Sequence, residues 1–184
     1  MHFAPDSEDT LEFIVALGNT HPSASRSGDD ELGTVEQLGA LLVEHTYSGR
    51  VDGDETELRE VQQTRDLLRE IWSLDRDDAA ERINVMLAEA RAMPYLMRHD
   101  HFDWHLHATS NDAPLAERIR VEAALALADM IRSDETHRMR VCDADDCTGL
   151  LLDLSRNGSK RFCSIRCGNR MNQLAFRSRA QEDS

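Results

Sequence analysis

The sequence predicts a mainly α protein, in which a multihelical N-terminal domain with one small β-hairpin precedes a small C-terminal α+β module. Three observations predict this arrangement. Apolar residues recur at the 3.6-residue period of helices through most of the first 136 residues, a short segment alternates at a period of two, and all four cysteines lie between positions 142 and 167. We therefore expect two domains, residues 1–136 and residues 137–184.

Four helices are expected in the first domain. Thr34, with Gln37 three residues later, forms the sequence pattern of a capping box that begins a helix ending near Tyr47. Apolar residues recur every three or four positions over about 56–73, 78–91 and 113–131, which predicts one amphipathic helix in each range. The apolar faces of these helices should supply the core of the domain.

The exception to the helical pattern is residues 102–109, where apolar and polar residues alternate as in a β-strand that could pair with residues 95–97. The histidines of this region are His99, His101, His105 and His107. A metal site is one hypothesis for them. We favour a half-exposed, solvated sheet face, because no partner ligand of matched spacing is visible in the sequence.

The four cysteines, Cys142, Cys147, Cys163 and Cys167, form the pattern C-x4-C-x15-C-x3-C. The N-terminus carries acidic residues where a secretory signal would be basic, so we expect a reducing, cytoplasmic compartment in which clustered thiols bind metal. Two close pairs can converge on one tetrahedral Zn²⁺, with each sulfur about 2.3 Å from the ion. This predicts one structural zinc ion per chain; an Fe–S cluster is the alternative occupant.

The residues around the cysteines predict the shape of the module. Residues 137–141 read as an extended entry, 150–154 as a strand, Asn157-Gly158 as a hairpin turn and 160–162 as the return strand. Ser164 can cap a helix that runs to about Arg179. Residues 143–146, between the first two cysteines, form a polar turn that we call the knuckle. The knuckle, the hairpin and a helix that carries the second cysteine pair together predict a treble-clef-like zinc finger.

Charge is distributed unevenly along the chain. The formal net charge is −14, yet residues 154–181 contain seven basic and no acidic side chains, which is typical of a surface that faces nucleic acid. Arginines can neutralise phosphates or reach guanine edges, and Asn or Gln can pair with adenine. The residues expected to contact DNA are Lys160, Arg161, Arg166, Asn169, Arg170, Gln173 and Arg177.

Three stretches resemble one known family: the first cysteine pair, Leu152-Asp153-x-Ser155-Arg156-Asn157, and Phe162-Cys163-Ser164-x-x-Cys167-Gly168-Asn169-Arg170. They are similar to the CGNR zinc finger, which closes a bacterial family of stress-induced transcription regulators with a helical ABATE domain. The resemblance implies that the four cysteines bind zinc and that the finger binds DNA. It also implies that the helical domain senses a signal.

The helical domain resembles the family at Asn19-Thr20, Arg65 and the strand of Trp104. A small-molecule effector could bind near these residues, although packing and surface hydrogen bonding are the interpretation we favour for all three. Their place in the fold decides between the two.

The function predicted from the sequence is a zinc-finger, DNA-binding transcription regulator that responds to a ligand or to stress through its helical domain. The alternative is a zinc-stabilised protein-interaction module that does not bind DNA, because the arginine-rich helix could instead lie on the acidic body. An enzyme is the least supported class, since the sequence shows no glycine-rich phosphate loop, nucleophile elbow or H-E-x-x-H pattern. No apolar run approaches the roughly 20 residues of a membrane-spanning helix, so we expect a soluble protein.

Overall fold

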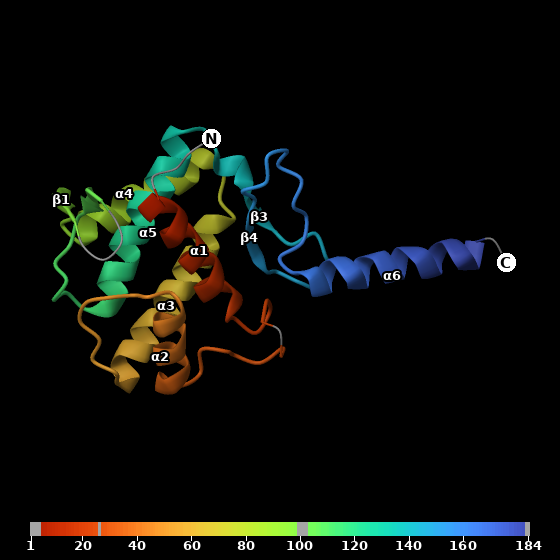
Figure 1. Ribbon diagram of the computed structural model, residues 1–184, viewed down its shortest axis with the longest axis horizontal. Helices are drawn as coiled ribbons and strands as arrows, with labels where there is room; N and C mark the ends of the chain where they lie inside the picture. The colour runs from red at the N-terminus through yellow and green to blue at the C-terminus, as the bar shows by residue number, and fades with distance from the viewer. Residues whose placement is uncertain (1–4, 26, 99–102, 183–184) are drawn as a thin grey trace.

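The computed structural model describes residues 5–25, 27–98 and 103–182. Five helices form the body: α1 (Pro5–Asn19), α2 (Val35–Glu44), α3 (Glu55–Trp72), α4 (Arg76–Glu89) and α5 (Leu115–Arg132). The chain also forms two short antiparallel pairs of strands. Strand β1 (Tyr95–Met97) pairs with β2 (His105–His107), and β3 (Met139–Val141) pairs with β4 (Leu150–Leu152). A 3₁₀ turn, η1 (Thr136–Arg138), precedes β3, and the last helix, α6 (Ile165–Glu182), projects away from the body (Figure 1). The mainly α class with small hairpins is confirmed.

Side chains that satisfy free backbone N–H groups begin three of the helices. Thr34 and Gln37 form the expected capping box of α2. The Asp54 carboxylate accepts hydrogen bonds from the first turn of α3, and Asp75 does the same for α4. The expected helices are therefore present, with boundaries shifted by a few residues.

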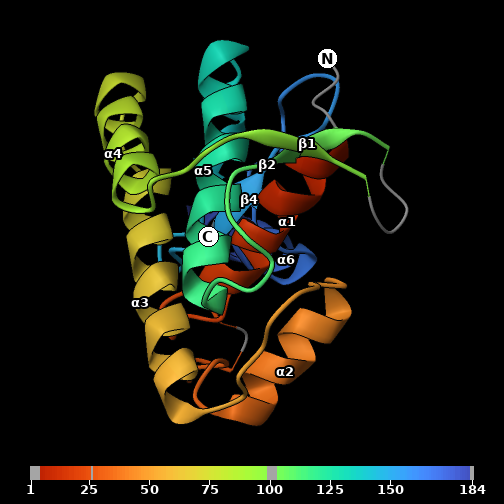
Figure 2. The same cartoon turned by 90° about the vertical axis from the view of Figure 1, so that its left-hand side faces the viewer.

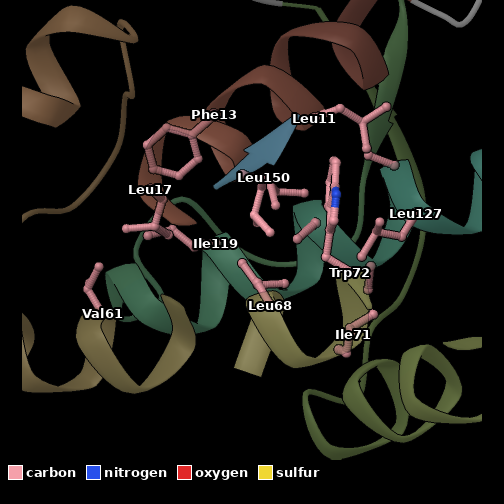
Figure 3. Packing of buried hydrophobic residues seen from close by; sticks show 14 of the residues in the cluster. Leu11, Phe13, Leu17, Val61, Leu68, Ile71, Trp72, Ile119, Leu127 and Leu150 are labelled. Atoms are coloured by element: carbon pink, nitrogen blue, oxygen red, sulfur yellow. The ribbon is translucent and has the colours of Figure 1, made fainter. Parts of the chain in front are cut away.

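Helix α5 lies at the centre of the body and packs against α1, α3 and α4. The core between these helices is formed by side chains such as Leu17, Leu68, Ile119 and Leu127, which Figure 3 shows converging from three helices. Leu150 of β4 lies in the same core, so the strand that follows the first cysteine pair packs directly on the helical body. The finger is thereby fixed to the body at its β-strands.

Helix α1 was not predicted from the sequence. Its buried side is formed by Leu11, Ile14 and Leu17, whose three-residue spacing is a helical signal, and Asp6 lies in its first turn, where a carboxylate favours a helix N-terminus. The helix packs along α5 and reaches β4 with its C-terminal end.

The β1–β2 hairpin has the expected partners, with Leu96 opposite Leu106, but its faces are reversed. His105 and His107 are buried, at 9% and 7% exposure, whereas Leu106 is 48% exposed. The interpretation of these two histidines as a solvated sheet face is wrong: a period of two fixes which residues share a face but not which face points inward. His99 and His101 lie outside the described residues.

The hairpin predicted around Asn157-Gly158 is replaced by a different pairing. Strand β4 pairs with β3, and residues 160–162 form no strand. Asp153 holds this connection as a compact loop, because its carboxylate accepts hydrogen bonds from the backbone N–H groups of Ser155 and Lys160. Among residues 5–25, 27–98 and 103–182, no helix is both long enough and apolar enough to cross a membrane.

Candidate metal centre and basic helix

The structure brings the four cysteine thiols together. One sulfur from each of Cys142, Cys147, Cys163 and Cys167 lies within 4.8 Å of the others. The Cys147 and Cys163 sulfurs are 3.7 Å apart, and those of Cys163 and Cys167 are 3.8 Å apart. Four sulfurs at about 2.3 Å from one tetrahedral ion would be roughly 3.8 Å from each other. The spacing therefore fits a single zinc ion with no open coordination position.

Local backbone structure positions each cysteine. Cys142 directly follows β3, and its N–H donates to the carbonyl of Gly149, which closes the turn that contains the knuckle and Cys147. A Cβ atom at Gly149 would lie 2.7 Å from the Cys163 sulfur, so only glycine fits at this turn. Cys163 lies just before α6 and Cys167 in its first turn, where the Cys167 N–H donates to the Ser164 hydroxyl. The cap expected at Ser164 is present.

Burial and neighbouring groups act on the thiols in different directions. Burial raises the pKa of the Cys163 thiol, and the adjacent cysteines raise it further. Burial alone would also raise the pKa of Cys167, but hydrogen bonds from Ser164 and the other thiols lower it. Zinc binds thiolates and so favours the deprotonated form of every ligand. A divalent cation bound at this cluster would therefore offset the cost of ionising the buried Cys163 thiol.

Two families account for the chain. Residues 138–180 match the family model of the CGNR zinc finger. Residues 11–134 match that of the ABATE domain, which is described as "Putative stress-induced transcription regulator". The chain belongs to the ABATE family. Its CGNR finger holds a four-cysteine cluster that is consistent with one structural zinc ion. No curated protein matches the chain.

The residues expected to contact DNA fall into two groups in the CGNR finger. Arg166, Asn169, Gln173 and Arg177 are exposed along α6, which extends clear of the ABATE domain (Figure 1). The others contact the finger itself. The Lys160 ammonium donates to the Leu152 carbonyl, and the Arg161 guanidinium pairs with Asp143 at 2.8 Å.

Arg170 contacts both halves of the four-cysteine site. Its guanidinium forms an ion pair with Asp146 at 2.5 Å and lies 3.7 Å from the Cys167 sulfur. Asp146 belongs to the knuckle between the first two cysteines, so this arginine joins α6 to the other half of the metal site. Its position gives Arg170 a structural role in the finger.

The residues at which the resemblance suggests an effector site each contact other residues of the chain. The Asn19 side chain bonds to the backbone of Leu150, and the buried Arg65 guanidinium pairs with Asp30 at 2.6 Å. Trp104 is 63% exposed beneath Arg98. These contacts support the packing and hydrogen-bonding interpretation of Asn19 and Arg65, whereas Trp104 makes a surface contact with Arg98.

A cavity of about 340 Å³ lies elsewhere in the ABATE domain, between α1, α5, β2 and the loop after α2. Its polar lining includes Tyr47, His105, His107 and Glu122. The alternation of the two histidines was visible in the sequence, but Tyr47 and Glu122 come from distant segments and carried no local signal. Figure 2 shows the β1–β2 hairpin lying across the helices of this end of the body.

Proposed function

We propose that the chain regulates transcription by binding DNA through α6 of its CGNR finger. The observation that carries this proposal is the position of α6: residues 172–179 are all exposed, and the segment 154–181 contains basic but no acidic residues. A helix that stands clear of an acidic body can enter a DNA groove without a clash. The family description of a transcription regulator supports this function and does not describe an enzyme.

The residues of α6 have different roles in this proposal. Arg166 and Arg177 neutralise phosphates or reach guanine edges, and Asn169 and Gln173 read adenine. Arg170 contributes charge but chiefly holds the helix on the knuckle through Asp146. Lys160 and Arg161 add backbone contacts beside the helix. Cys142, Cys147, Cys163 and Cys167 ligate one Zn²⁺, which fixes the first turn of α6.

The ABATE domain, residues 1–136, acts as the sensor and the finger, residues 137–184, as the output. The physical link is α1, because its N-terminal half lines the 340 Å³ cavity and its last residue, Asn19, bonds to β4 of the finger. A small-molecule effector that enters the cavity can alter this helix and thereby the finger. The two ends of one helix thus connect the site of binding with the site of response.

The ion pairs of Arg161 and Arg170 with acidic residues of the knuckle favour the second candidate, a protein-interaction module without DNA binding. The two functions are separated with the full chain and the double variant Arg166→Ala, Arg177→Ala. We expect the wild type to be retained on duplex DNA at low salt and the double variant to elute earlier. Arg132→Ala, which removes an exposed arginine from the ABATE domain, is the matched control and should behave as wild type. Equal elution of all three proteins favours the interaction module.

A further inference from the structure

The two buried histidines of β2 face each other through the same ring atom. His105 and His107 are two residues apart on the strand, so both side chains lie on its inward face. Their Nε2 atoms are 2.8 Å apart, and both rings line the 340 Å³ cavity. Neither residue is a ligand of the zinc site in the finger. The pair places two imidazole nitrogens that can ligate a metal side by side in one cavity.

The opposite ring nitrogens have acceptors. His105 Nδ1 lies 2.8 Å from the carbonyl oxygen of Asp103, and a carbonyl can only accept, so this Nδ1 carries a hydrogen. Nε2 is therefore the nitrogen of His105 that can offer a lone pair to a metal ion.

His107 Nδ1 lies 4.0 Å from a carboxylate oxygen of Glu122, which places a negative charge beside this ring. The Tyr47 hydroxyl donates to the other oxygen of Glu122 at 2.6 Å and holds the carboxylate in place. Burial and the Glu122 charge raise the pKa of Tyr47, so its hydroxyl remains a donor. The two Nε2 atoms are 2.8 Å apart, so the rings either share a hydrogen between these atoms or hold a cation there.

We propose that His105 and His107 bind a divalent first-row transition metal ion of the zinc class through their Nε2 atoms. Metal-bound histidines commonly donate the other ring N–H to a carbonyl or a carboxylate; here the Asp103 carbonyl accepts from His105, and the Glu122 carboxylate lies 4.0 Å from His107 Nδ1. Glu122 is thus a positioning residue. Imidazole nitrogens suit zinc, nickel and copper better than calcium or magnesium, whose preferred ligands are oxygen.

The cavity supplies the remaining coordination positions. Zinc–nitrogen distances of about 2.0–2.1 Å place two ligand atoms of a tetrahedral site roughly 3.4 Å apart, so the two rings must separate by about half an ångström. Adjacent empty space permits this movement, and Asp6 and Asp9 of α1 also line it. Two protein ligands leave positions open to water or to an oxygen-bearing ligand, unlike the closed thiolate site. This site is independent of whether the finger binds DNA.

The test measures metal stoichiometry. The purified full chain is dialysed to equilibrium against buffered free Zn²⁺, and bound zinc is determined by elemental analysis. We expect two equivalents for the wild type and one for the double variant His105→Ala, His107→Ala. The matched control is His137→Ala, which removes an exposed histidine that also lies beside a carboxylate, Glu135, and it should retain two. One equivalent in the wild type, as expected if the rings only share a proton, overturns the proposal, as does a second equivalent in the double variant.

Two further measurements protect the test against a variant that fails to fold. Glu122→Gln keeps both histidines and should lower the affinity for the second zinc ion by about 10–100-fold, as loss of a carboxylate beside a metal-bound histidine does at other metal sites. In the wild type, Co²⁺ is titrated in place of zinc. The first equivalent should give thiolate-to-cobalt charge transfer, and the second should add ligand-field bands without it. Charge-transfer absorption that grows through both equivalents contradicts a histidine site.

Discussion

Asn19 and Leu150 are joined by two hydrogen bonds across 131 positions of the sequence. The Asn19 side-chain amide donates to the Leu150 carbonyl at 2.9 Å, and its carbonyl oxygen accepts the Leu150 N–H at 2.7 Å. One side chain thus satisfies both backbone groups of a strand residue, as a neighbouring strand would. Gly18 lies close beside it, because an added Cβ would be 2.6 Å from the Leu150 side chain. The end of α1 is fitted to β4 at the junction between the ABATE domain and the finger.

Replacing Asn19 by alanine should lower the free energy of unfolding by about 1–3 kcal/mol. The change leaves the N–H and carbonyl of a buried strand residue without their partner, and such groups are costly to leave unpaired. Urea denaturation followed by circular dichroism measures the effect. Asn172→Ala is the control, because Asn172 is exposed on α6 and its loss should leave stability nearly unchanged. Equal midpoints for the two variants would contradict a structural role for Asn19.

Removal of the finger metal should unfold α6 and the knuckle but leave the helical body intact. The small finger depends on metal for its folding free energy, whereas the body has its own apolar core. Because Leu150 and Leu152 belong to that core, we expect β3 and β4 to remain docked. Amide hydrogen exchange after chelation, or in Cys163→Ser, should show lost protection in the knuckle and beyond residue 153, and retained protection in α3 and α5. Loss of protection throughout the chain would show one cooperative unit.

The sequence predicts ligand chemistry and local spacing well. It predicts poorly which distant segments lie side by side. The cysteine spacing anticipated the four-thiol cluster, because metal ligands must converge whatever fold surrounds them. Thr34 and Gln37 anticipated the capping box, since both partners are local. The Asn157-Gly158 signal was outweighed by Asp153, whose carboxylate closes the loop without a return strand.

The inward face of β2 could not be predicted for a related reason. Leu106 is the more apolar residue, yet the helices already fill the core, so the hairpin covers a polar cavity with His105 and His107 instead. Glu122 and Tyr47 join these histidines from α5 and from the loop after α2. Only the three-dimensional structure brings these segments together.

As the pH falls, the free energy of unfolding should decrease more steeply for the wild type than for the Asp30→Asn variant. Hydrogen bonds from Arg65 hold the pKa of the Asp30 carboxyl below its usual value. A depressed pKa in the folded state means that this contribution to stability is present above the unfolded value of about 3.9 and is lost as pH falls through the folded value. Urea midpoints measured from pH 6 down to pH 3 should show the difference below about pH 4. Asp66→Asn, at a more exposed carboxylate that also contacts Arg65, is the control and should keep the wild-type slope.

Alanine variants of Arg170 and Arg177 should distinguish the structural role of α6 from its role in contacting DNA. Arg177→Ala removes an exposed charge, so DNA affinity should fall and zinc retention should not change. If Arg177 contacts a phosphate, the slope of log affinity against log salt should become shallower by about one unit, because fewer counterions are released on binding. Arg170→Ala breaks the contact with Asp146 and with the Cys167 sulfur, so zinc should also be lost more readily to a chelator.

The measurement pairs DNA affinity over a range of salt concentrations with the rate of zinc transfer to a chromogenic chelator. The acidic body, with 29 acidic and 14 basic side chains in the first 140 residues, should repel DNA most strongly at low salt, so the affinity of every variant should fall less steeply with salt than the basic contacts of the finger alone would give. If Arg177→Ala released zinc as fast as Arg170→Ala, the distal half of α6 would be part of the metal site's support. If neither variant changed DNA retention, α6 would not be the DNA-binding element.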